Sequence, residues 1–139
     1  MVKLPLIYFV CSGNSARSQM AEGFARQIFG DRFEVLSGGL EPSVLNPYAV
    51  RVMTEIGIDI SGQFSKPIKV DRLRSASIAV TLCGDAEERC PVTPPSVLRL
   101  HWPLLDPAKA TGSAEERLAT FRAVRDEILE RMADLAKTL

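Results

Sequence analysis

The feature that most constrains this chain is a loop of small residues, Cys11–Ser18, between an apolar run and an amphipathic segment. The run Leu6–Val10 is continuous, which predicts a strand buried on both faces of a parallel sheet. The segment from Ser18 to Phe29 places its apolar residues at helical spacing. A short loop between such elements turns its backbone N–H groups inward, and the helix adds the positive end of its dipole. The stretch therefore predicts a binding site for a tetrahedral oxyanion.

Cys11 and Arg17 give this loop a nucleophile and a cation. Arginine binds an oxyanion through two parallel hydrogen bonds, and a positive field favours a thiolate. We therefore expect Cys11 to be a thiolate that attacks an anion held by Arg17 and the loop amides. The alternative is a small buried apolar residue, because twelve arginines make a Cys-x5-Arg spacing easy to reach by chance.

The residue types inside the loop favour the anion site over that alternative. Glycine and asparagine tolerate left-handed backbone, and Ser18 can either cap the helix or donate to the sulfur. The expected oxyanion-binding residues are Ser12, Gly13, Asn14, Ser15, Ala16, Arg17 and Ser18.

The rest of the chain alternates strands with helices. Further strands are expected at 33–37, where Gly38-Gly39 would end the strand, and at 77–82 and 97–100. Helices are expected from the Asn46 cap to Gly57, with Val50, Met53 and Ile56 inward, over one or two turns at 71–75, and from the capping box Ser113–Glu116 onward. Residues 58–70 form a loop, and the last helix buries Leu118, Phe121, Val124, Ile128, Met132 and Leu135.

This alternation predicts an α/β fold, a doubly wound parallel four-stranded sheet flanked by helices, in a single domain spanning residues 1–139. Ligands of such sheets bind beyond the carboxyl ends of the strands. Cys11, Cys83 and Asp106 each follow an expected strand, so all three should meet at one edge of the sheet.

Charge and hydropathy exclude several classes of partner. The formal net charge is zero and no basic block is present, so neither nucleic acid nor an acidic membrane surface is expected to bind. No stretch reaches the roughly 20 apolar residues of a membrane span, and the N-terminal apolar run is too short for a signal peptide. We expect a cytoplasmic monomer in which three cysteines serve reactive roles rather than a disulfide framework.

The loop Cys11–Ser18 resembles the phosphate loop of the low-molecular-weight protein tyrosine phosphatases. It is still more similar to that of the thioredoxin-coupled arsenate reductases built on the same fold. The likeness continues through Gln19–Gly23, Val80–Cys83, Cys90-Pro91 and His101-Trp102, and so covers nearly the whole chain.

The second and third cysteines form a Cys83-x6-Cys90 segment. A zinc site is not expected, because the single histidine, His101, lacks a metal-type spacing to them. Inert thiols are the alternative, but the polar neighbours of Cys90 indicate an accessible and reactive one. The resemblance implies that Cys83 and Cys90 are the two resolving cysteines of a reductase.

The Asp106-Pro107 pair matches the general acid of both branches of the family, although Asp-Pro is also a common turn dipeptide. The phosphatases typically follow this proline with tyrosine, whereas here Ala108-Lys109 follows, as in the reductases.

The resemblance implies reduction of arsenate to arsenite, with phosphate or sulfate as analogues of the substrate. Cys11, Cys83 and Cys90 would form successive redox disulfides, Arg17 would hold the anion and Asp106 would act as the acid. Thioredoxin would be the electron donor, with no bound cofactor or metal. Two alternatives stay open: a low-molecular-weight tyrosine phosphatase, and a non-catalytic sensor that binds arsenite or a metal through its thiols.

One departure from the pattern of the family leads to a further expectation. Some reductases of this family hold a potassium ion through positions that match Asn14, Glu22 and Ser37, plus an aspartate that this chain lacks. Lys66 either neutralises Glu22 in the ion's place or points into solvent.

Residues 84–89 favour a helix in the reduced protein. An intact helix would keep Cys83 and Cys90 about 10 Å apart, too far for a disulfide, so we expect 83–95 to move.

Overall fold

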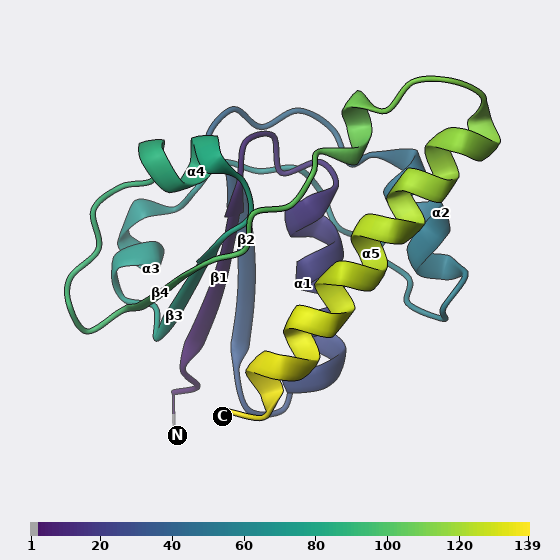
Figure 1. Ribbon diagram of the computed structural model, residues 1–139. Helices are drawn as coiled ribbons and strands as arrows, with labels where there is room; N and C mark the ends of the chain where they lie inside the picture. The colour runs from purple at the N-terminus through teal and green to yellow at the C-terminus, as the bar shows by residue number, and fades with distance from the viewer. Residues whose placement is uncertain (1–2) are drawn as a thin grey trace.

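A computed structural model describes residues 3–139 of the chain, apart from the side chain of Asp85. Four parallel strands form one sheet in the order β2-β1-β3-β4, with helices on both faces (Figure 1). The expected doubly wound α/β fold is therefore confirmed. In chain order, the elements are β1 Leu6–Cys11, α1 Arg17–Phe29, β2 Glu34–Gly39, α2 Pro47–Thr54, α3 Val70–Arg74, β3 Ile78–Thr81, α4 Gly84–Arg89, β4 Leu98–His101, the 3-10 turn η1 Pro107–Lys109 and α5 Ala114–Ala136.

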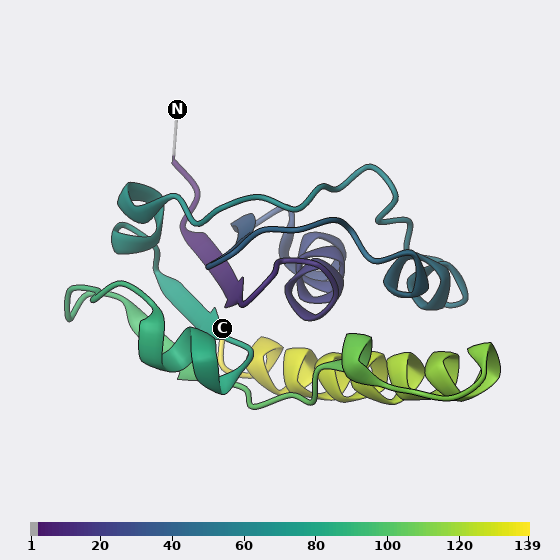
Figure 2. The same cartoon turned by 90° about the horizontal axis from the view of Figure 1, so that it is seen from above.

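The layers follow from the apolar character of the central strand. All six residues of β1 are buried, because β2 and β3 flank it and helices cover both sides. Figure 2 shows α1 and α5 on one side of the sheet and α3 and α4 on the other. The loop after β1 and the start of α4 consequently lie at the same end of the sheet (Figure 1).

Strand β2 extends through both glycines that were expected to end it. A Cβ atom on Gly39 would lie 2.8 Å from the backbone nitrogen of Asn14. A Cβ atom on Gly38 would lie 2.9 Å from the Cα of Ile68. The two glycines therefore let the end of the strand pass between the Cys11–Ser18 loop and the segment around Pro67, which bridges to Gly39.

Helix α2 stops earlier than its apolar pattern predicted. It begins at Pro47 with the Asn46 cap, as expected, but it ends at Thr54. Gly57 has a φ of +82°, which turns the chain away. Ile56 is therefore 41% exposed, and its predicted inward position is wrong.

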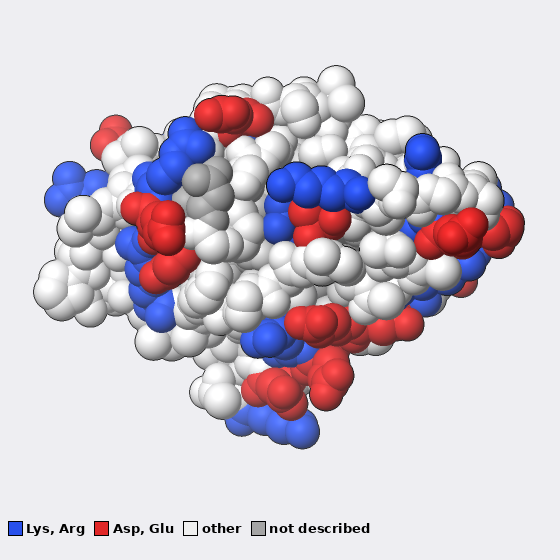
Figure 3. All heavy atoms as spheres, turned by 45° about the horizontal axis from the view of Figure 1, so that its top comes forward, with Lys and Arg blue, Asp and Glu red and all other residues white. Residues whose placement is uncertain are grey.

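Helix α5 has the predicted capping box, in which the side chains of Ser113 and Glu116 each bond the backbone of the other. The inward residues expected for it are all buried: Leu118, Phe121, Val124, Ile128, Met132 and Leu135. Within residues 3–139, no helix combines the length and apolarity that crossing a membrane would require. On the face in Figure 3, acidic and basic side chains lie interspersed.

Candidate active site

The loop after β1 turns its carbonyl oxygens outward, away from the hollow that it encloses. The main-chain N–H groups of residues 40, 41, 43 and 46 donate to the carbonyl oxygens of Cys11, Ser12, Gly13 and Ser15. In a trans peptide the following N–H points opposite to the carbonyl, and the described residues contain no cis bond. The loop N–H groups are thus directed toward a hollow of about 280 Å³. We call this hollow, with its loop Cys11–Ser18, the oxyanion cradle.

Asn14 holds the cradle in shape. Its φ is +47° and it is fully buried, a backbone conformation that asparagine tolerates better than most residues. Its side-chain nitrogen donates to Ser18 and Ser37, and its side-chain oxygen accepts from Gln19 and from the Lys66 N–H. Each polar atom of this buried amide is therefore bonded, and the left-handed turn is fixed from several directions.

The Cys11 sulfur lies 2.8 Å from the Ser18 hydroxyl. Asn14 Nδ2 donates to that hydroxyl oxygen at 2.7 Å, which favours direction of the hydroxyl proton toward the sulfur. Helix α1 starts with Ala16 as its N-cap and has no side-chain cap bond. Two roles were expected for Ser18, a cap of the helix and a donor to the sulfur. The structure shows the contact with the sulfur.

Arg17 and Asp106 face each other across the mouth of the cradle. Their closest atoms, Arg17 Nη2 and Asp106 Oδ2, lie 3.6 Å apart, and Arg17 Nη1 also donates to the Leu104 carbonyl. Asp106 Oδ1 accepts from the Ala108 N–H at 3.0 Å, which fixes the carboxyl at the start of η1. Arg17 is buried and Asp106 is partly exposed, so a cation lines the inside of the cradle and an acid stands at its entrance.

Cys83 reaches the same edge from β3. Its sulfur lies 3.2 Å from the hydroxyl of Ser12 in the cradle loop, and it accepts from the Ala86 N–H as the cap of α4. The predicted meeting of Cys11, Cys83 and Asp106 at one edge of the sheet is thus confirmed.

Cys90 differs from its expected setting. It is 8% exposed, so the polar sequence around it does not leave it accessible. The reason is that Ala86 of α4 is buried in the core, and Cys90, whose N–H bonds the Ala86 carbonyl, is buried in the same cluster. Burial raises the pKa of the Cys90 thiol, and the Arg99 charge partly opposes this. Cys11, Cys83 and Cys90 are all free thiols, and the intact helix at 84–89 confirms the fold expected for the reduced segment.

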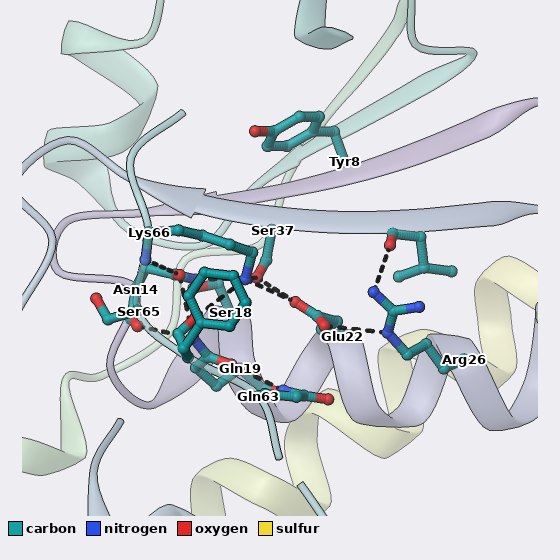
Figure 4. A network of polar contacts seen from close by, with 12 residues as sticks. Tyr8, Asn14, Ser18, Gln19, Glu22, Arg26, Ser37, Gln63, Ser65 and Lys66 are labelled. Atoms are coloured by element: carbon teal, nitrogen blue, oxygen red, sulfur yellow. Dashed lines mark hydrogen bonds and ion pairs between the residues drawn. The ribbon is translucent and has the colours of Figure 1, made fainter. Parts of the chain in front are cut away.

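Lys66 lies where its ammonium neutralises Glu22, the first of its two expected positions. The Nζ atom lies 3.1 Å from a Glu22 oxygen and 3.0 Å from the Ser37 hydroxyl (Figure 4). Glu22 is 3% exposed and also receives Arg26 from the next turn of α1. The position beside the cradle is therefore occupied by a cation that belongs to the chain.

Several supporting residues were not predicted from the sequence. Ser65 donates to the Gly13 carbonyl, and Gln63 bonds both the backbone and the side chain of Gln19. These contacts come from the 58–70 loop, whose polar sequence has no periodic signal. The Gly38-Gly39 pair was the available sign that another segment approaches here, but it fits the end of a strand equally well.

Among the described residues, no group of three His, Cys, Asp or Glu side chains is arranged to hold a metal ion. His101 lies in β4 with Nδ1 2.9 Å from the Thr81 hydroxyl, and Trp102 is buried against Phe9. Both are therefore placed in the sheet region rather than in the cradle.

Comparison with known proteins agrees with this geometry. Residues 6–139 match the family model described as low molecular weight phosphotyrosine protein phosphatase. An arsenate reductase of Bacillus subtilis (strain 168) is 55% identical over 96% of each chain. A solved arsenate reductase in a phosphate-binding state superposes with a TM-score of 0.78 at 38% identity, over 97% of this chain and 98% of that one. A thioredoxin-dependent arsenate reductase of Corynebacterium glutamicum gives a TM-score of 0.72 at 27% identity, over 98% of this chain and 64% of that one.

Proposed function

The chain belongs to the low molecular weight phosphotyrosine protein phosphatase family, and from that premise we propose that it is an arsenate reductase, which converts arsenate to arsenite. The relative with 55% identity carries this name, and its match extends over almost the whole of both chains. The phosphate-binding state of a solved arsenate reductase supports a tetrahedral oxyanion as the ligand of the cradle.

The observation that carries the proposal is the second thiol beside the cradle. Phosphate ester hydrolysis in such a site needs one cysteine and one acid, here Cys11 and Asp106. Cys83 adds a sulfur that contacts the cradle loop through Ser12. A second thiol in this place has a use in a reaction that transfers electrons from sulfur, and reduction of arsenate is such a reaction.

In the first step, the loop N–H groups and Arg17 hold arsenate with its arsenic atom in front of the Cys11 sulfur. The Cys11 thiolate forms a bond to arsenic. An oxygen of the arsenate leaves as water after Asp106 supplies a proton. The Ser18 hydroxyl, 2.8 Å from the sulfur, stabilises the thiolate before the attack.

In the second step, the Cys83 thiolate attacks the Cys11 sulfur of this adduct. The sulfur–sulfur bond forms as the sulfur–arsenic bond breaks, and the electron pair of the broken bond reduces As(V) to As(III). Arsenite leaves and a Cys11–Cys83 disulfide remains.

In the third step, Cys90 attacks Cys83, a Cys83–Cys90 disulfide forms and Cys11 leaves as a thiolate. A thioredoxin then reduces this disulfide, which restores the three thiols. The thioredoxin-dependent relative from Corynebacterium glutamicum supports this electron donor. We further propose that the chain works as a monomer in the cytoplasm, where cysteines are kept reduced.

The test is arsenate-dependent consumption of NADPH in the presence of thioredoxin and thioredoxin reductase. We expect turnover with arsenate, none without it, and loss of turnover in Cys83→Ser. A phosphatase without reductase activity would hydrolyse an aryl phosphate, would consume no NADPH with arsenate, and would lose no function in Cys83→Ser. A thiol sensor would bind arsenite stoichiometrically without oxidising thioredoxin, and either of these results would overturn the proposal.

A further inference from the structure

A polar cluster outside the cradle ties α4 to the sheet. Glu87, in the middle of α4, accepts a hydrogen bond of 2.5 Å from the hydroxyl of Thr81, the last residue of β3. The same carboxylate oxygen lies 3.8 Å from Arg99 Nε and 3.9 Å from His101 Nδ1, both on β4. None of these residues lines the cradle. The mechanism above therefore gives them no direct contact with the substrate.

The proton positions in this cluster follow from the donors and acceptors present. An ionised carboxylate only accepts, so the Thr81 hydroxyl proton points to Glu87. The Thr81 oxygen is then an acceptor toward His101 Nδ1 at 2.9 Å, which also lies 3.3 Å from the Thr81 carbonyl. Nδ1 therefore carries a proton, and a directed chain of bonds runs from His101 through Thr81 to Glu87.

Arg99 holds the backbone on both sides of Cys90. Its Nη2 donates to the Glu87 carbonyl at 3.1 Å and its Nη1 donates to the Pro91 carbonyl at 3.3 Å. The Glu87 carbonyl belongs to the last turn of α4, where carbonyl groups have no partner within the helix. Arg99 Nε is the buried polar side-chain atom that has no hydrogen-bond partner in the described part of the chain. The Arg99 guanidinium thus bonds two carbonyl groups, those of Glu87 and Pro91, which lie on either side of Cys90 in the sequence.

We propose that Arg99 and Glu87 are positioning residues for Cys90, which hold it at the end of an intact α4 in the reduced protein and must release it before the third step. This inference rests on the disulfide relay proposed above. In that step the Cys83–Cys90 bond forms, the Cys11–Cys83 bond breaks and the Cys11 thiolate leaves, so no net electron transfer is required. Residues seven positions apart on a helix lie about 10 Å apart along its axis, and a disulfide needs Cα atoms about 4.4–6.8 Å apart. The arrangement in which Arg99 and Glu87 hold an intact α4 therefore belongs to the dithiol form.

The cluster consequently sets how readily the Cys83–Cys90 disulfide is reduced. Substitutions that remove its bonds destabilise the dithiol form and leave the disulfide form unaffected. A residue with a general structural role would destabilise both forms alike, and so would leave the redox equilibrium unchanged. The measurement that separates the two roles is the equilibrium constant between Cys83–Cys90 and a reference dithiol.

The experiment uses the full chain with Cys11→Ser, in which Cys83 and Cys90 are the remaining thiols, equilibrated with oxidised and reduced dithiothreitol. We expect Arg99→Gln and Glu87→Gln to shift the equilibrium toward the disulfide by about tenfold each, the order expected for hydrogen bonds to charged groups. Arg99→Lys keeps the charge but cannot bond two carbonyls in a fixed fork, so it should show most of the same shift. Glu88→Gln, an equal change at the neighbouring exposed position, should show none.

A second measurement protects the test against variants that fold poorly. Hydrogen exchange of the reduced proteins should show faster exchange at residues 86–90 in Arg99→Gln and Glu87→Gln, with β1 unchanged. If Arg99→Gln and Glu87→Gln both have the same redox equilibrium constant as Glu88→Gln, the positioning role is wrong. The disulfide relay itself would not be contradicted by that result. Absence of any Cys83–Cys90 disulfide in the Cys11→Ser parent would overturn the relay, and this inference with it.

Discussion

The Cys83 sulfur and the Ser12 hydroxyl lie 3.2 Å apart, which links the cap of α4 to the oxyanion cradle. Ser12 therefore acts on both halves of the site, with its backbone in the cradle and its side chain on the second thiol. We therefore expect substitution of Ser12 to separate anion binding from the proposed electron transfer.

We expect Ser12→Ala to slow arsenite formation about tenfold, the order expected for loss of a hydrogen bond to a thiolate. Hydrolysis of para-nitrophenyl phosphate should be unaffected, because the backbone of the loop stays in place. Parallel assays of both reactions check this, with the exposed Ser96→Ala as the control. Equal loss of both activities in Ser12→Ala would show that the hydroxyl acts on the anion rather than on Cys83.

The three cysteines should separate by activity. Cys11→Ser should abolish arsenate reduction and any aryl phosphatase activity together, because both begin at the same sulfur. Cys83→Ser and Cys90→Ser should abolish turnover with thioredoxin and leave the phosphatase activity in place. A Cys11→Ser protein that still reduces arsenate catalytically would show that Cys11 is not the nucleophile.

The ion pair between Lys66 and buried Glu22 should make the protein indifferent to potassium. We expect activity and Tm to stay the same when potassium replaces sodium at constant ionic strength. Lys66→Gln should cost about 2 kcal/mol, less than a fully isolated buried charge because Arg26 remains beside Glu22. Lys69→Gln, an exposed change of the same type, should have little effect. A clear potassium-specific rise in the Tm of the unmodified protein would contradict this account.

The buried thiol of Cys90 predicts a loss of stability in alkaline solution. Its folded-state pKa is raised by burial, so the unfolded chain releases this proton at a lower pH than the folded one. The free energy of unfolding is therefore unaffected below the ordinary thiol pKa and falls as the pH rises toward the raised value. We expect the Tm of the reduced protein to decline as the pH rises above about 8, where an ordinary thiol begins to ionise.

Cys90→Ala should remove part of that decline. Burial also raises the pKa of Tyr8, so Tyr8→Phe identifies the contribution that sets in at still higher pH. A decline of the same size in Cys90→Ala and in the parent would show that this thiol is not its source.

Much of the fold was predictable because its signals are local. The apolar run of β1, the Asn46-Pro47 start of α2 and the capping box of α5 each depend on neighbouring residues. The error at Ile56 arose where a glycine with positive φ turned the chain before the apolar period was complete. Local periodicity cannot show where such a turn overrides it.

The part of the site that lies in one continuous segment was predictable from the sequence. The cradle lies within eight consecutive positions, and the rule for parallel sheets placed Cys83 and Asp106 beside it. The contact of Ser65 with Gly13 joins segments far apart in the sequence, and the bracketing of Cys90 by Arg99 joins β4 to the end of α4 across a loop. Their partners are backbone carbonyls, which no side-chain pattern marks. The burial of Cys90 was missed for the same reason, because a polar hexapeptide gives no sign of which side will face the sheet.

The central claim is that two thiols of this chain supply the electrons for one arsenate, and a single turnover without thioredoxin tests it most directly. Reduced protein is mixed with excess arsenate, and arsenite, free thiols and the disulfide position are measured together. The account predicts one arsenite for each chain, the loss of two thiols, and a Cys83–Cys90 disulfide that becomes Cys11–Cys83 in Cys90→Ser. Arsenite without loss of thiols, or loss of thiols without arsenite, would contradict it.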